Sequence, residues 1–357
     1  MITLILYYKN LICLFYFPEY DKVVFMITEL LTNSSWLQPQ INFLIHLQNL
    51  RMNMGAVLDE FFIAITKFGG ELLYPTLFVA VIYWCINAKS GLYLFLVNGF
   101  TLIFSQLLKM AACVYRPWFL DNSIKPSELV MKTAGSYSFP SGHSMMAASV
   151  WGAMAYVFRN IKWLCAFLIF FTLLIGFSRL YLGVHTPQDV IVGLLTGVVF
   201  IFLVPKIIDW CEKSKNRYLY LLAFANLFVI LVMFYVLTKN YPMDYIDGKL
   251  LVNPRRALDI SIIYFGWILG LLNGALLCKR FFSFDAKSGS LKTKIIRGIV
   301  GVVTTFALFS IIQYGMFYNH VITDYKLVMP ITFLVGLYIT AIYPFIFSKL
   351  LKKYLYD

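Results

Sequence analysis

Residues 163–208 read WLCAFLIFFTLLIGFSRLYLGVHTPQDVIVGLLTGVVFIFLVPKII, and this stretch decides the class of the protein. Its two apolar runs, 163–180 and 189–208, are each long enough to cross the hydrocarbon of a bilayer as a helix. Arg179 lies at the end of the first run, Asp189 opens the second, and His185 lies in the link between them. Ionisable groups so close to lipid are costly and indicate a functional site. The stretch therefore predicts a membrane helical hairpin with a chemical site at its turn.

The composition of the whole chain extends this prediction. Of 357 residues, 61% are hydrophobic and 13% are charged, whereas a soluble domain is about 25% charged. We therefore expect an all-α, polytopic membrane helical bundle, because only helices and closed barrels satisfy the backbone in lipid and these runs are too long for barrel strands. About nine transmembrane helices are predicted, at 72–88, 92–114, 142–158, 163–180, 189–208, 218–237, 260–278, 298–317 and 328–348.

The net charge of +13 is explained by membrane topology. If Lys89 lies in the cytoplasm, then 16 of the 30 lysines and arginines fall in connections on that same side. Such a bias is the positive-inside pattern of membrane proteins. It predicts an external N-terminus and an internal C-terminus, and it argues against nucleic acid as a partner.

Three segments are separable along the chain. Residues 1–71 form an N-terminal extension in which 36–68 have the polar and apolar alternation of interfacial helices; a loop packed on the bundle is an equal alternative. Residues 72–217 form a five-span core that holds every motif, and 218–357 add four spans. Residues 1–25 lack the features of a signal peptide, and a start at Met26 is a further hypothesis.

The first motif places two cations near the end of the second predicted span. Lys109 and Arg116 are seven residues apart, so a helix would project both from one face. Pro117 disfavours helix at Arg116 and places this arginine just beyond the span. Arginine grips a phosphate with two donors and lysine adds a point charge, although snorkelling to lipid headgroups is the alternative.

The second motif, Pro140-Ser141-Gly142-His143, opens the third span. Gly142 permits close approach of a phosphate, and the free amides of a helix N-terminus bind anions. Ser141 adds a hydroxyl donor, and His143 in the first turn is placed to protonate a leaving oxygen. An ordinary helix start with an interfacial histidine is the alternative.

The third motif combines Ser178-Arg179 with His185 and Asp189. Thr186 can cap the next helix with Pro187 at its first position, so Asp189 falls at the third position. A carboxylate there can hold one imidazole nitrogen of His185 as N–H, which leaves the other nitrogen free to attack phosphorus. Asp189 could instead serve only as a cap. The predicted topology brings all three motifs to the same membrane face.

Taken together and in this order, the motifs resemble those of the type-2 phosphatidic acid phosphatase superfamily. The resemblance covers 109–189 and extends plausibly to 58–208. It implies a phosphatase core over 72–217, with His185 as the nucleophile that forms a phosphohistidine, Asp189 orienting it, and His143 as the acid. It further implies that Lys109, Arg116, Ser141, Gly142, Ser178 and Arg179 bind the phosphoryl oxygens, with no metal or cofactor.

These features predict a phosphatase of the cell membrane with its active site on the extracytoplasmic side. The first expectation for its partner is a membrane lipid phosphate or lipid pyrophosphate, because a site at the mouths of the spans lets the tail stay in lipid. A soluble sugar phosphate is the first alternative, since the span number and length resemble glucose-6-phosphatase. A lipid transporter or scaffold that uses the extra spans is the second.

Overall fold

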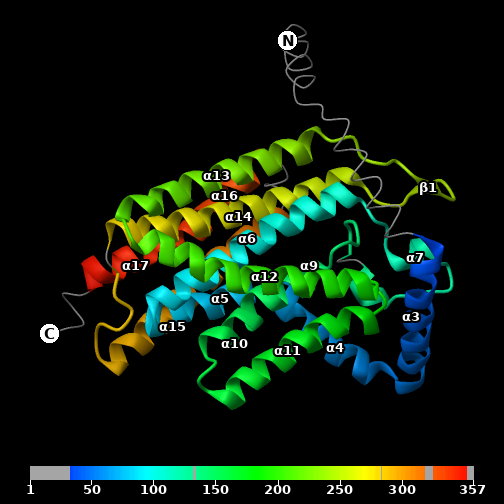
Figure 1. Ribbon diagram of the computed structural model, residues 1–357, viewed down its shortest axis with the longest axis horizontal. Coiled ribbons are helices and arrows are strands. Elements are labelled where there is room, and N and C mark those ends of the chain that lie inside the picture. The colour runs from blue at the N-terminus through cyan, green and yellow to red at the C-terminus, as the bar shows by residue number, and fades with distance from the viewer. Residues whose placement is uncertain (1–32, 132–133, 283, 318–324, 352–357) are drawn as a thin grey trace, which may run out of the picture.

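The computed structural model describes residues 33–131, 134–282, 284–317 and 325–351. About four fifths of these residues are helical, and the long helices run alongside one another (Figure 1). The predicted helical membrane class is confirmed, while the hypothesis of a start at Met26 lies outside the described residues. The long helices are α3 (Ser34–Met54), α4 (Ala56–Gly70), α6 (Ala88–Ala112), α11 (Lys162–Tyr181), α12 (Pro187–Glu212), α13 (Lys215–Thr238), α14 (Pro254–Phe281), α15 (Leu291–Phe317) and α16 (Tyr325–Leu337).

Shorter elements complete the chain. They are α5 (Leu73–Val81), the π-helical η1 (Ile82–Ile86), α7 (Pro117–Leu120), α8 (Glu128–Met131), α9 (Gly142–Ala147), η2 (Ala148–Gly152), α10 (Ala153–Val157), η3 (Tyr338–Ile342), α17 (Tyr343–Ile346) and η4 (Phe347–Leu351). Two strands, β1 (Tyr245–Ile246) and β2 (Lys249–Leu250), pair antiparallel. Asp247 and Gly248 join them with positive φ angles, as a tight hairpin turn requires.

The predicted spans are recovered in part. Within the described residues, seven helices are long and apolar enough to cross a membrane, and the bent pair Val57–Gly70 and Leu73–Ile86 raises the number to eight. The predicted run 142–158 is divided among α9, η2 and α10, which fall short of a full span by that measure. A total of nine crossings is therefore not confirmed.

The N-terminal helices α3 and α4 take different positions. Helix α3 lies across one end of the bundle, roughly perpendicular to the long helices, while α4 runs among them (Figure 1). Helix α4 packs against α9 and α11 and meets α5 at an angle of 61°. The position of α3 is the one expected for an interfacial helix. Because α4 instead packs against core helices, a segment boundary at residue 71 stays a prediction.

Small residues bring the core helices together at the end of the bundle that α3 covers. A Cβ on Gly193 of α12 would lie 2.8 Å from the Ser141 carbonyl oxygen, and one on Gly197 would lie 2.4 Å from the Ala148 Cβ. Glycines four residues apart let helix backbones approach closely in a membrane. This contact holds the start of α12 against the start of α9.

The helices of the C-terminal segment 218–357 also approach one another closely at glycines. A Cβ on Gly270 of α14 would lie 2.0 Å from the Phe333 carbonyl oxygen of α16. Helix α14 in turn packs on α6, where Gly99 faces Leu272. One apolar cluster runs through both α6 and α14. The additional helices are therefore built onto the core and share its interior.

Candidate active site

The first and third motifs meet at the end of the bundle that α3 covers. Arg116 follows α6 and caps α7, and its guanidinium Nη1 lies 2.8 Å from Nε2 of His185. The same Nη1 donates to the Val184 carbonyl at 2.9 Å, and Nε donates to the Ser136 carbonyl at 3.0 Å. These bonds fix the guanidinium beside the imidazole.

The tautomer of His185 follows from this contact. A guanidinium can only donate, so Nε2 of a neutral imidazole must accept and the ring proton must sit on Nδ1. Nδ1 lies 3.3 Å from Oδ2 of Asp189. Burial lowers the pKa of His185 well below its usual range, and the positive charges of Arg116 and Arg179 lower it further. His185 is therefore neutral near pH 7, with the lone pair of Nε2 directed at a cation.

The Asp189 carboxylate is held by the start of its own helix and by Ser138, which lies just before the second motif. Its Oδ2 accepts the Thr186 backbone N–H at 2.9 Å and the Ser138 hydroxyl at 2.6 Å. Thr186 is the N-cap of α12 and Pro187 its first residue, as predicted. The carboxylate thus caps the helix and faces His185 at the same time.

The second motif is joined to the third through the backbone. Ser141 donates its N–H to the Asp189 carbonyl at 2.9 Å and caps α9, where its hydroxyl oxygen accepts the Ser144 N–H at 3.3 Å. Beside it, a Cβ on Gly142 would meet only Ser105 Oγ, at 3.8 Å. The helix start therefore leaves space next to Gly142 into which a ligand can fit.

Lys109 lies on α6, buried under the segment that leads into α9. Its ammonium donates to the carbonyls of Tyr137 at 2.8 Å, Ser138 at 3.3 Å and Pro140 at 2.9 Å. The three protons of the ammonium thus all have acceptors. Lys109 ties down this segment and brings a positive charge beneath it.

Arg179 and Ser178 close α11, but only Arg179 points across the bundle. Its Nη1 donates to the Thr66 hydroxyl of α4 at 2.7 Å, and its buried Nε has no hydrogen-bond partner among the described residues. The Ser178 hydroxyl instead donates to the Ile175 carbonyl of its own helix at 2.6 Å. Arg179 is therefore a buried cation with a donor still available.

His143 is half-buried in the first turn of α9, and its ring lies against the end of α4. A Cβ on Gly70 would lie 2.0 Å from His143 Nε2, 2.6 Å from Cδ2 and 2.8 Å from Cε1. The adjacent Gly69 faces the His143 carbonyl oxygen in the same way, at 2.9 Å. The ring can occupy this position only because the helix ends in two glycines.

The charges of the site do not balance. Lys109, Arg116 and Arg179 are 7%, 6% and 1% exposed, and the fully buried Asp189 is the only carboxylate that joins this cluster within the described part of the chain. With His185 neutral, three positive charges and one negative charge leave two uncompensated positive charges out of water. Buried charge is costly unless it is paired. The cluster is thus complementary to a dianion, and a phosphate monoester has this charge.

Several contributors were absent from the sequence prediction. Ser138 precedes the second motif by only two residues but belongs to no predicted site, and Thr66 and Gly70 come from α4. The start of α12 is also held by α3, where Trp36 Nε1 and Gln40 Nε2 donate to Gln188 Oε1 at 2.7 Å and 3.1 Å. The paired glycines were the one available signal, because adjacent glycines at a helix end indicate close approach.

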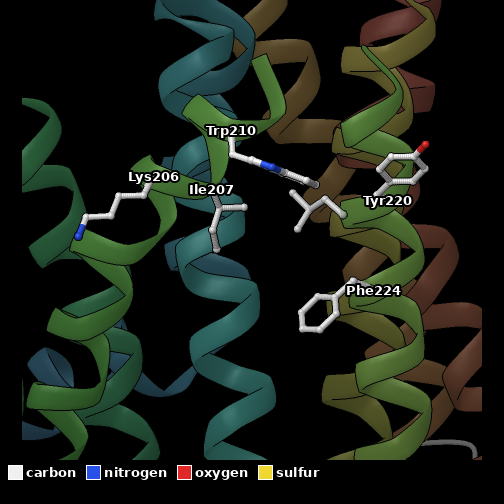
Figure 2. A pocket seen from close by; sticks show the side chains of 6 residues that line it. Lys206, Ile207, Trp210, Tyr220 and Phe224 are labelled. Atoms are coloured by element: carbon white, nitrogen blue, oxygen red, sulfur yellow. The ribbon is translucent and has the colours of Figure 1, made fainter. Parts of the chain in front are cut away.

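A crevice elsewhere on the bundle lacks these histidine and arginine side chains. A crevice between α12 and α13 is lined by Lys206, Ile207, Trp210, Tyr220, Leu221 and Phe224, and its walls are apolar and aromatic (Figure 2). Trp210 lies 21 residues from Asp189, about 30 Å along α12.

Among the residues that the structure describes, no group of three or more His, Cys, Asp or Glu side chains could hold a metal ion.

Comparisons with known proteins agree with the motifs. A family profile described as "PAP2 superfamily" matches residues 90–213, and one described as "PAP2 superfamily phosphatase, transmembrane extension" matches 262–354. The chain is similar to phosphatidylglycerophosphatase B of Bacillus subtilis, with 30% identity over 173 residues that cover 45% of this chain and 80% of the relative. Similarity to an undecaprenyl-diphosphatase of Sulfolobus acidocaldarius is 27% over 154 residues, or 43% and 72% of the two chains. The crystal structure of a transmembrane PAP2-type phosphatidylglycerolphosphate phosphatase from Bacillus subtilis matches with a TM-score of 0.42 and 25% identity, covering 53% of this chain and 96% of that one.

Proposed function

The chain belongs to the PAP2 superfamily of phosphatases, and from this premise we propose that it hydrolyses a lipid phosphate or lipid pyrophosphate at the extracytoplasmic face of the cell membrane. The observation that carries the proposal is the pair of uncompensated positive charges buried beside His185. A substrate phosphate neutralises them. Preorganised donors of this kind stabilise the charge of a phosphoryl transition state.

In the proposed mechanism, Nε2 of His185 attacks phosphorus while the bond from phosphorus to the leaving oxygen breaks. The leaving oxygen takes a proton from protonated His143, and a phosphohistidine remains. Burial and the positive charges of Arg179 and Arg116 lower the pKa of His143 well below its usual range, and the negative charge of a bound phosphate would raise it again. Water then attacks the phosphohistidine as His143 accepts its proton, which restores both histidines. Attack requires Arg116 to transfer its Nη1 donor from Nε2 to a phosphoryl oxygen, because the two atoms lie 2.8 Å apart in the unliganded site.

The remaining residues would divide the work. Asp189 and Ser138 would hold Nδ1–H of His185 and so favour the attacking tautomer. Arg116, Arg179 and the space at Gly142 would receive the phosphoryl oxygens, while Lys109, Ser141 and Ser178 would mainly hold the backbone that surrounds them. Because the buried basic side chains supply positive charge that metal ions provide elsewhere, we expect turnover without a metal.

A lipid substrate is supported by the position of the site at the ends of the helices. An amphiphile can present its headgroup there while its tail stays between the lipids. Two of the relatives named above, a phosphatidylglycerophosphatase and an undecaprenyl-diphosphatase, carry lipid phosphates in their names. They favour a lipid because the match covers 80% and 72% of those two proteins, whereas a glucose-6-phosphatase catalytic subunit of Haplochromis xenognathus, 32% identical over 120 residues, is covered to 43%.

A substrate panel tests the proposal. Phosphate release would be measured in proteoliposomes with phosphatidate, phosphatidylglycerophosphate, undecaprenyl pyrophosphate and glucose 6-phosphate, with and without EDTA. We expect release from at least one lipid, unaffected by EDTA, and none from His185→Ala. His46→Ala, which changes an exposed histidine on α3, is the matched control. Hydrolysis of glucose 6-phosphate alone would refute the lipid assignment, and activity in His185→Ala would refute the nucleophile.

The side of the membrane needs a separate measurement. The β1–β2 hairpin lies at the same end as the site, where Asp244 accepts a hydrogen bond from Tyr115 (Figure 1). Lys249→Cys should therefore react with an impermeant maleimide in intact cells. Lys213→Cys, at the opposite end of α12, should react only after permeabilisation. The reverse pattern would place the site in the cytoplasm.

A further inference from the structure

We propose that the end of the bundle opposite the candidate active site holds a second site, which binds a phosphate-bearing anion such as a lipid headgroup. A pocket of about 460 Å³ opens there between α6, α12, α13 and α14. Its polar lining comprises Lys89, Glu212, Lys215, Tyr218 and Lys279.

The pocket is distinct from the catalytic cluster. Lys89 is the second residue of α6 and Lys109 lies 20 residues further on, so about 30 Å of helix separates them. The pocket also lies where the core and the added helices meet, because Lys89 and Glu212 belong to α6 and α12 while Lys279 belongs to α14. It can be tested without any assumption about catalysis.

Charge is the first reason to place an anion there. Lys89 pairs with Glu212 at 2.9 Å, whereas Lys215 and Lys279 have no ion-pair partner in the described part of the chain. Helices α6 and α13 both begin at the pocket, at Ala88 and Lys215, so the positive ends of two long helix dipoles point toward it. The pocket carries an excess of two lysines and is favourable for a negative ligand.

The buried hydroxyl of Tyr218 is the second, independent reason. Tyr218 is 4% exposed and lines the pocket, yet its hydroxyl has no hydrogen-bond partner among the described residues. A buried hydroxyl normally has a partner. A ligand oxygen that reached this buried hydroxyl from the pocket would accept from it and satisfy it.

The chemistry of the lining identifies the ligand class. Ammonium groups act as point charges on phosphate, and basic pockets between transmembrane helices bind the phosphate of lipid headgroups. Apolar walls from Leu92 and Ala275 lie beside the lysines, as an amphiphile requires. By contrast, the crevice at Lys206 is aromatic and apolar, and the Lys206 side chain extends away from it (Figure 2).

Binding would be measured on the full-length protein in phosphatidylcholine nanodiscs. Phosphatidylglycerol is titrated in and the lipid retained per protein is counted by native mass spectrometry; inorganic phosphate is titrated separately against the thermal midpoint. We expect Lys215→Gln and Lys279→Gln each to weaken binding about fivefold. Tyr218→Phe should weaken it about tenfold while leaving the stability of the ligand-free protein unchanged or raised. Lys206→Gln is the matched control.

The two titrations distinguish the source of the anion. Loss of phosphatidylglycerol binding in the pocket variants supports a headgroup site, and loss of phosphate binding alone supports a site for a free anion. Equal binding of both ligands by wild type and all pocket variants would overturn the proposal. So would an equal effect of Lys206→Gln. None of these readouts depends on turnover, so failure of the proposed phosphatase activity would not affect them.

Discussion

Gly70→Ala tests the placement of the proposed acid without altering any polar group of the site. The added methyl would lie 2.0 Å from His143 Nε2, whereas non-bonded heavy atoms settle about 3.5 Å apart. The ring must therefore move by about 1.5 Å. A displacement of about 1 Å can cost about 100-fold in rate, and general acid catalysis contributes about 10²–10⁴-fold. We expect kcat for an alkyl phosphate to fall about 100-fold.

The assay compares two leaving groups in the same detergent. An alkyl leaving oxygen needs a proton from His143, whereas p-nitrophenolate leaves without one. Gly70→Ala should therefore slow a lipid phosphate strongly and p-nitrophenyl phosphate little. Gly298→Ala is the control, because a Cβ there meets only Cys85 Sγ at 3.3 Å. An equal loss for both substrates would show that the methyl damaged the phosphate site or the fold, and retention of the alkyl rate would refute the contact.

Three further outcomes follow from the same geometry. The Asp189→Asn variant should stay folded, because an amide oxygen can still accept the Thr186 N–H. Its kcat should fall at least about 100-fold, because the His185 tautomer is no longer fixed. A near-normal rate would contradict the orienting role of Asp189. Ser138→Ala removes a 2.6 Å hydrogen bond to the Asp189 carboxylate and should lower kcat about tenfold, measured against the exposed Ser35→Ala. Since the neutral form of His185 attacks and burial among cations lowers its pKa, the acid limb of kcat/KM should lie below pH 6.5. Arg179→Gln removes one of those cations, so it should raise this pKa and move the limb to higher pH; an unmoved limb would show that another group titrates.

The sequence was sufficient to predict the class of fold and the meeting of the motifs. Long apolar runs specify helices in lipid. Because successive spans run in opposite directions, the ends of two spans and the starts of the two that follow them reach the same membrane face; they are the ends of 92–114 and 163–180 and the starts of 142–158 and 189–208. The cap Thr186-Pro187 and the carboxylate at Asp189 depend on neighbours within four residues, so local rules predict them. Arg116 does not reach the site through a helix face shared with Lys109, as the spacing of seven residues predicted. Helix α6 ends at Ala112, and Cys113 has a φ of 51°, so a turn of the chain and not a helical face directs the arginine.

Contacts between residues far apart in the sequence could not be predicted, because no periodic pattern marks them. Thr66 reaches Arg179 across 113 residues, and Gln40 reaches Gln188 across 148. Nothing in the local pattern of either partner indicates the other. The charge balance of the site could not be predicted for the same reason. A sequence does not show which carboxylate, if any, lies beside each of the three cations; only the packing of the helices does.

The placement of Lys109 changes how the charge of the site is understood. A lysine whose three protons all meet backbone carbonyls cannot grip a ligand unless it gives up a bond, so its charge acts through the segment that it holds. Arg179 differs, since its buried Nε has no partner within the described chain and its Thr66 bond uses only one of its donors. In the proposed mechanism, direct contact with the substrate phosphate is therefore expected first from Arg179 and Arg116. This division gives the buried Lys109 a function in the proposed mechanism: without it, the carbonyls of Tyr137, Ser138 and Pro140 would lie unpaired beside the bound anion and would repel it.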